Sequence, residues 1–126
     1  MQYLRYTMLM AVAFAPAAFA DCTFVEHTVT GTVVANDQPV AGATVEAEWV
    51  EKKAGIASTR AKTDEVGRYV LTITFDPYSA RSFGGKETCE GKLEEVIVRV
   101  RAAGRDPYEK RVAITEQAED VNLALR

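Results

Sequence analysis

The sequence predicts an all-β protein, folded as a single antiparallel β-sandwich. Apolar and polar side chains alternate with a period of two, which is the pattern of a strand that buries one face. Turn-forming residues recur at roughly 8–15-residue spacing between the alternating segments. No stretch after the first 20 residues shows the three-to-four-residue apolar spacing of an amphipathic helix. Together these observations favour a sandwich of short strands.

Four segments show the alternation most clearly, and we expect strands over residues 28–35, 44–50, 69–75 and 96–101. In the third of them, Tyr69, Leu71 and Ile73 lie on one face, and Thr72 and Thr74 lie on the other. Weaker patterns predict further strands over residues 56–63, 108–114 and 121–125.

Two turns punctuate these strands. One is Asn36-Asp37-Gln38-Pro39, and the other is Thr63-Asp64-Glu65-Val66-Gly67. Asn and Asp side chains hydrogen-bond to nearby backbone, and a glycine adopts positive φ without strain. We therefore expect Gly67 to close a tight connection.

Residues 76–92 do not fit the alternating pattern, and we expect a long connection there between two strong strands. Long connections in compact domains are often functional. This one contains Tyr78, Arg81 and Phe83, which are residue types favoured at binding surfaces. We predict these three as a binding site. The alternative is a solvated crossover whose aromatic side chains cover an open edge of the core.

The first 20 residues resemble a cleaved export signal. Arg5 precedes an uncharged, mostly apolar run, and Ala18-Phe19-Ala20 supplies the small residues that a signal peptidase accepts, which predicts cleavage before Asp21. A membrane anchor needs about 20 continuous apolar residues, whereas Pro16 interrupts this shorter run. A lipoprotein would need Cys22 directly after the cleavage site, but Asp21 intervenes. We expect a periplasmic or extracellular protein with no membrane insertion after cleavage.

Export bears on the two cysteines, Cys22 and Cys89. An even pair in an oxidising compartment most simply forms a disulfide. Such a bond would close a long loop and tie down the N-terminus of the mature chain. The alternatives are two free thiols and an intermolecular bridge.

Composition excludes several classes of function. The chain has 15 basic and 18 acidic side chains, and only Arg5 lies in the first 20 residues, so residues 21–126 carry a formal net charge of −4. Nucleic-acid binding requires a basic surface, which this charge does not favour. One His and two Cys are too few for a His/Cys metal centre, and the acidic groups lack the spacing of a calcium loop. We expect neither a metal nor a cofactor.

Three motifs resemble those of a known family. They are Val29-x-Gly31-x-Val33, Gln38-Pro39-Val40-Ala41-Gly42-Ala43-x-Val45 and Thr63-Asp64-x-x-Gly67-Arg68-Tyr69-x-Leu71. The chain over residues 29–71 is similar to the carboxypeptidase regulatory-like family, and the similarity continues loosely through residues 96–103 and 120–123. The resemblance implies a prealbumin-like (transthyretin-like) Greek-key sandwich of about seven strands. Family members serve as accessory domains of peptidases, as extracellular modules and as parts of outer-membrane receptors, so the resemblance implies no single activity.

Hydroxyisourate hydrolase, a transthyretin-like enzyme, is the catalytic relative to consider. Its pattern has a His near the first strand and an Arg after the hairpin turn, and His27 and Arg68 could occupy these positions. The pattern also has a second His and a Tyr-Arg-Gly-Ser tail, and this sequence has neither. Hydrolysis needs a positioned acid or base and a stabiliser of negative charge. We therefore expect that the protein is not an enzyme.

The remaining interpretation is an exported, non-enzymatic binding or structural module. We expect the partner to be another exported or outer-membrane protein, contacted through residues 78–85 or an exposed strand edge. A glycan is the less favoured partner. The alternative function is a small-ligand carrier of the transthyretin type, which binds its ligand in a channel between subunits.

Overall fold

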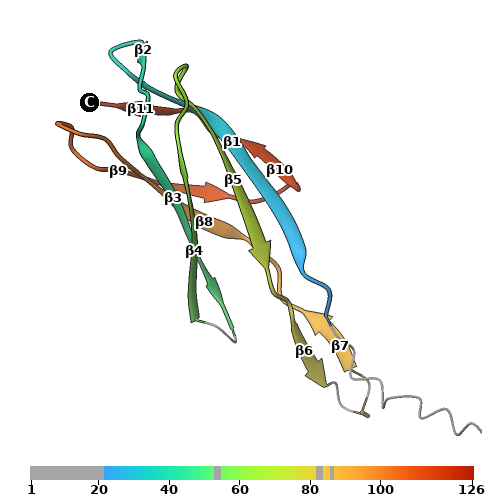
Figure 1. Ribbon diagram of the computed structural model, residues 1–126. Coiled ribbons are helices and arrows are strands. Elements are labelled where there is room, and N and C mark those ends of the chain that lie inside the picture. The colour runs from blue at the N-terminus through green and yellow to red at the C-terminus, as the bar shows by residue number, and fades with distance from the viewer. Residues whose placement is uncertain (1–21, 53–54, 82–83, 86) are drawn as a thin grey trace, which may run out of the picture.

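The computed structural model describes residues 22–52, 55–81, 84–85 and 87–126, and every regular element in these ranges is a strand (Figure 1). The predicted export signal and Phe83 lie outside the described residues. The strands are β1 (Val25–Ala35), β2 (Gln38–Pro39), β3 (Thr44–Glu51), β4 (Gly55–Lys62), β5 (Arg68–Phe75), β6 (Tyr78–Arg81), β7 (Glu87–Glu90), β8 (Glu95–Arg101), β9 (Tyr108–Ala113), β10 (Ala118–Asp120) and β11 (Leu123–Leu125).

Two sheets form the layers of the sandwich. In the first, which we call the β1 sheet, β5 and the short β2 pair antiparallel with β1, while β10 and β11 pair with it in parallel. In the second, the β3 sheet, the order is β4-β3-β8-β9 and all pairs are antiparallel. The predicted sandwich is confirmed, and each expected strand is present within about two or three residues of its predicted ends.

The strand expected over residues 121–125 begins only at Leu123, as β11, and a short strand that was not predicted, β10, precedes it. Both pair with β1 in one continuous register, from Thr30 opposite Asp120 to Val33 opposite Leu123. Between them, the side-chain oxygen of Asn122 accepts the hydrogen bond of the Thr32 backbone N–H at 3.1 Å. A side chain therefore replaces a backbone carbonyl at this point of the ladder.

The inward faces of the two sheets form the core. Every second residue of the main strands is buried there, which is the physical origin of the alternation in the sequence. The fully buried members include Val29, Val33, Val45, Ala47, Leu71, Ile73, Val96, Val98 and Val100. Such burial of apolar area is the main favourable term in folding.

Glu51 is a buried acidic residue at the end of β3. Its Oε1 accepts hydrogen bonds from the indole N–H of Trp49 at 3.0 Å and from the backbone N–H of Asp76 at 3.3 Å. A buried polar group is tolerated when it is hydrogen-bonded. This cluster connects the end of β3 to the end of β5.

The two predicted turns are present. Asn36 and Asp37, with φ of 50° and 60°, connect β1 to β2, and two successive positive φ values are typical of the tightest hairpin turns. Gly67 has φ of +77°, and a Cβ there would lie 2.7 Å from the carbonyl oxygen of Val33. The predicted positive φ at Gly67 is confirmed, and the close packing against Val33 is a second requirement that the sequence did not indicate.

Residues 76–92 correct a prediction. The expected connection contains a two-stranded antiparallel hairpin, β6–β7, in which Tyr78 lies opposite Glu90 and Arg81 opposite Glu87. The hairpin belongs to neither layer of the sandwich. Because neither of its faces is part of the core, the sequence shows no alternating apolar pattern from which these strands could be predicted.

Candidate functional site

The predicted disulfide is present between Cys22 and Cys89, whose Cα atoms lie 5.5 Å apart. It joins the residues that precede β1 to the middle of β7. Two-stranded hairpins are marginally stable by themselves in water. The covalent bond therefore anchors an element that the core does not hold.

The β6–β7 hairpin extends beyond the sandwich, in continuation of β5 (Figure 1). Tyr78 is half-buried, and its ring carbons would lie 3.0 Å from a Cβ at Gly91. The ammonium of Lys52, just after β3, lies 4.3 Å from the centroid of the same ring. A cation over an aromatic face stabilises the contact by roughly 0.5–1 kcal/mol at exposed sites. Tyr78 thus connects the base of the hairpin to the β3–β4 turn.

The structure separates the predicted binding residues. Tyr78 and Arg81 both lie on β6, but three positions apart, so their side chains point to opposite faces of the hairpin. Arg81 is exposed, whereas Tyr78 is partly used by the fold. The two residues therefore do not share one face of the hairpin.

An apolar pair at the same end of the sandwich was not predicted. Val50 and Ile56 are direct partners on β3 and β4, and their side chains are 75% and 71% exposed. Scattered exposed apolar residues are ordinary, but adjacent ones form a patch. The exposure of Val50 could have been predicted from the sequence, because Val50 is in the same alternating set of positions as the outward-facing Glu46 and Glu48. Its pairing with Ile56 could not, because it depends on the register of β3 with β4.

A hollow of about 290 Å³ adjoins this apolar pair. Its walls are the end of β3 and the segment that leads from the hairpin into β8, and the residues that line it are Glu48, Trp49, Val50, Lys92, Leu93, Glu94, Glu95 and Ile97. We call the surface formed by Val50, Ile56, this hollow and the β6–β7 hairpin the hairpin-end surface. It combines apolar contact area with charged groups at its rim, as protein interfaces do.

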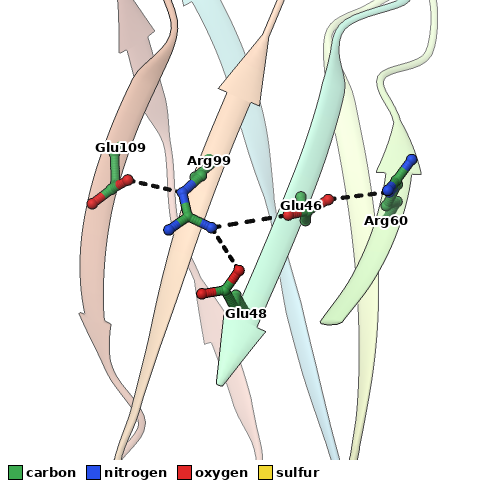
Figure 2. Close-up of polar contacts among 5 residues, drawn as sticks. All are labelled: Glu46, Glu48, Arg60, Arg99 and Glu109. Carbon is green, nitrogen blue, oxygen red and sulfur yellow. Dashed lines mark hydrogen bonds and ion pairs between the residues drawn. The ribbon is translucent and has the colours of Figure 1, made fainter. Parts of the chain in front are cut away.

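The outward face of the β3 sheet carries a chain of ion pairs (Figure 2). Arg99 contacts Glu48 and Glu109 at 2.8 Å each and Glu46 at 3.9 Å, and Glu46 also pairs with Arg60 at 3.1 Å. Hydrogen bonds to Glu48 and Glu109 raise the pKa of the Arg99 guanidinium. These charged side chains pair with one another, so we assign them a structural role and not a binding role.

The residues considered for hydrolase chemistry lie apart. In the register of β1 with β5, His27 is opposite Ile73, whereas Arg68 is opposite Thr32. Five residues along a strand correspond to about 16 Å. The Nδ1 atom of His27 lies 3.4 Å from the backbone oxygen of Glu116, which places it beside the C-terminal segment. Among the described residues, no three His, Cys, Asp or Glu side chains are grouped so that they could hold a metal ion.

No family model and no curated protein matches this chain. Among solved structures, it is similar to chlorocatechol 1,2-dioxygenase from Pseudomonas putida, with 14% identity and a TM-score of 0.53 over 81% of this chain and 59% of that one. It is also similar to the major plantain pollen allergen Pla l 1, with 18% identity and a TM-score of 0.50 over 81% and 94% of the two chains.

A third similar structure is the dioxygenase domain of a dioxygenase–carbohydrate-binding protein fusion from Streptomyces sp. SirexAA-E, with 12% identity and a TM-score of 0.55 over 86% and 84% of the two chains. At these identities, the likeness shows the fold alone. The chain spans about three-fifths of the Pseudomonas putida enzyme. None of the three is described as carboxypeptidase regulatory-like, so that resemblance stays a prediction.

Within the part of the chain that the structure describes, no helix is long and apolar enough to cross a membrane. The disulfide and the all-β fold are compatible with export.

Proposed function

We propose that this protein is an exported, non-enzymatic binding module that contacts another exported or outer-membrane protein through its hairpin-end surface. The observation that carries the proposal is the exposed Val50–Ile56 pair, at the end of the sandwich from which the disulfide-anchored hairpin extends. The resemblance to carboxypeptidase regulatory-like modules agrees with such an accessory role.

The energetic argument rests on exposed apolar area. Complete burial of a Val or Ile side chain contributes about 1.5–3 kcal/mol of favourable free energy. Val50 and Ile56 are mostly exposed, so most of this free energy is still available when a partner covers them. Apolar anchors near the centre of an interface contribute most to binding, and a charged rim confers specificity. Glu94, Glu95 and Lys92 provide that rim.

The hairpin adds a second kind of contact. Each of its strands pairs with the other alone, so each has one edge without a strand partner among the described residues. Unpaired strand edges can add a strand from another protein. A covalent anchor at Cys89 limits the order that the hairpin must gain on binding, and less lost entropy means higher affinity.

The test is partner capture by the exported full chain with its disulfide formed. The double variant Val50→Ser/Ile56→Ser removes the apolar pair, and we expect it to lose most of the recovered partner. Val66→Ser is the matched control, because Val66 is 56% exposed but lies in the β4–β5 turn at the other end of the sandwich. Equal recovery by the double variant and the wild type, with both folded, would contradict the proposal.

A second variant separates the hairpin from the apolar pair. Replacing Tyr78, Arg81 and Phe83 together with Ala tests the residues that the sequence indicated. We expect weaker capture than for the wild type, since these residues lie on or between the hairpin strands. Circular dichroism and intact mass before and after reduction establish that the sandwich and the disulfide are retained.

A further inference from the structure

We propose that the outward face of the β1 sheet binds a neutral sugar unit of a glycan, in a polar hollow centred on Thr30 and Thr32. This site lies on a different layer from the charged face of the β3 sheet, and its ligand class differs from the protein partner proposed above. The hollow has a volume of about 270 Å³ and is lined by Thr30, Gly31, Thr32, Arg68, Tyr69, Val70, Asp120 and Asn122.

The strand register builds this hollow. Arg68 on β5 lies opposite Thr32, while Val70 on β5 and Asp120 on β10 both lie opposite Thr30. The two strands that flank β1 lie about 9–10 Å apart, which is twice the spacing of neighbouring strands. Short threonines on β1 form the floor, and longer side chains on both neighbours form the rim.

Asn122 is held in a defined orientation. Its Oδ1 accepts hydrogen bonds from the backbone N–H of Thr32 at 3.1 Å and from the Thr32 hydroxyl at 3.0 Å. A backbone N–H can only donate, so the oxygen of the amide must face Thr32. The NH₂ group therefore points away from Thr32, and it has no hydrogen-bond partner among the described residues.

Arg68 and Asp120 flank the hollow without contacting each other. Within the described part of the chain, neither side chain forms an ion pair or a hydrogen bond. The hollow thus offers the donors of Arg68 and Asn122, the acceptor oxygens of Asp120 and the Thr30 hydroxyl, all available to a ligand. Val70, 59% exposed, adds one apolar surface.

This arrangement selects the ligand class. The negative charge of Asp120 repels an anionic ligand, and the positive charge of Arg68 repels a cationic one. A ligand with donors and acceptors on adjacent atoms and no net charge satisfies both sides, and the neighbouring hydroxyls of a sugar have this property. Val70 offers no aromatic ring, and the side chain of Tyr69 is buried, so we expect weak binding of a single sugar, with a Kd of about 1 mM or weaker.

The same face provides room for further sugar units. Thr28 and Thr72 are direct partners in the next outward-facing row, about 7 Å along the strands. They extend a row of hydroxyl groups from the hollow toward the hairpin end. We therefore expect a linear oligosaccharide to bind more tightly than its monosaccharide.

The test is an NMR titration of the full exported chain, labelled with ¹⁵N, against cellotetraose, maltotetraose, chitotetraose and laminaritetraose. We expect saturable shifts with at least one of them at the amides of Thr30, Thr32, Val70 and Asn122. An anionic alginate tetrasaccharide is the charged comparison. Shifts by this anion alone, shifts that map elsewhere, or no shifts with any of the four would overturn the proposal.

Variants assign the contacts. Arg68→Ala and Asp120→Ala each remove one side chain that has no hydrogen-bond or ion-pair partner in the described protein, and we expect each to weaken binding by about tenfold or more. Asn122→Asp keeps the acceptor for Thr32 but removes the NH₂ donors, so it should weaken binding with the fold retained. Arg101→Ala, on the β3 sheet, is the matched control and should bind as the wild type does. Undiminished binding by both Arg68→Ala and Asp120→Ala would also overturn the proposal.

Discussion

The phenol of Tyr69 donates a hydrogen bond to the backbone carbonyl of Val121 inside the sandwich. Tyr69 lies on β5 and Val121 lies between β10 and β11, so the hydrogen bond connects β5 to the segment on the opposite side of β1. This hydrogen bond lies beside Gly31. A Cβ at Gly31 would be 1.8 Å from the Val121 oxygen and 2.9 Å from the Tyr69 hydroxyl. The glycine in the motif Val29-x-Gly31-x-Val33 therefore leaves the space that this hydrogen bond needs.

Gly31→Ala should destabilise the fold by about 3 kcal/mol, because the added methyl group meets backbone that cannot move freely. Urea unfolding of the disulfide-bonded protein measures the change. Gly104→Ala is the control, since a Cβ at Gly104 has open space and costs only its backbone strain at φ of +72°, about 1–2 kcal/mol. Equal losses for the two variants would show that the close approach at Gly31 is unimportant.

Tyr69→Phe should cost about 1–2 kcal/mol near neutral pH, because it removes the donor to a buried carbonyl. Burial, and secondarily the charge of Asp120, raises the pKa of Tyr69 in the folded protein. The unfolded phenol ionises near pH ~10, so the contribution of Tyr69 is complete below that pH and declines as pH rises toward the folded pKa. The wild type should therefore lose more stability than Tyr69→Phe between about pH 8 and pH 10.5 in denaturant titrations. Parallel curves would contradict this.

Glu119→Gln should lower the Tm at neutral pH but not in acid. The Glu119 carboxylate accepts hydrogen bonds from the backbone N–H groups of Thr115 and Glu116 at 2.9 Å each, and these bonds lower its pKa. A lowered folded pKa contributes stability above about pH 4, which is lost as pH falls through the folded value. Calorimetry at about pH 7 and pH 3 tests this, with the exposed Glu65→Gln as control. A difference in Tm between the wild type and Glu119→Gln that is the same at both pH values would contradict this prediction.

Removal of the disulfide in Cys22→Ser/Cys89→Ser should destabilise the protein by up to about 4 kcal/mol, from the loop entropy regained by the unfolded chain. Hydrogen exchange should accelerate most at Ser79 and Thr88 in the hairpin, and less at Leu71 in the core. Intact mass before and after reduction verifies the starting point, because the disulfide-bonded protein is lighter by two hydrogens. A mass that begins at Asp21 would agree with the proposed export. Uniform acceleration in hairpin and core would indicate that the bond anchors the whole sandwich instead.

Arg99→Gln should lower the Tm by a few degrees at low salt, because Arg99 contacts Glu48 and Glu109 in the chain of ion pairs shown in Figure 2. At 1 M salt the screening length falls to about 3 Å, so the difference from the wild type should shrink. Arg111→Gln is the comparison, since its single contact with Glu95 is longer, at 3.3 Å, and more exposed. An effect of Arg99→Gln that does not change with salt would point to packing of its aliphatic stem instead.

Sequence reasoning succeeded where burial acts on neighbouring residues. Strands β3, β5 and β8 each bury alternate residues, so the alternation of apolar and polar residues within each segment was enough to predict them. It failed at β6 and β7, since a hairpin outside both layers has no buried face to produce the pattern. It grouped Tyr78 with Arg81 because they are close in the chain, although strand geometry directs them to opposite faces.

By itself, the sequence determined the class of fold and the glycine of the β4–β5 turn, because these follow from local periodicity and local backbone conformation. It also predicted the cysteine pair, from an even number of cysteines in an expected oxidising compartment. Only the tertiary structure decided which surface side chains meet. Strand register places Val50 opposite Ile56, and sheet order places Arg68 and Asp120 on the two strands that flank β1. Those pairings depend on how the whole core closes, and no short segment of sequence encodes them.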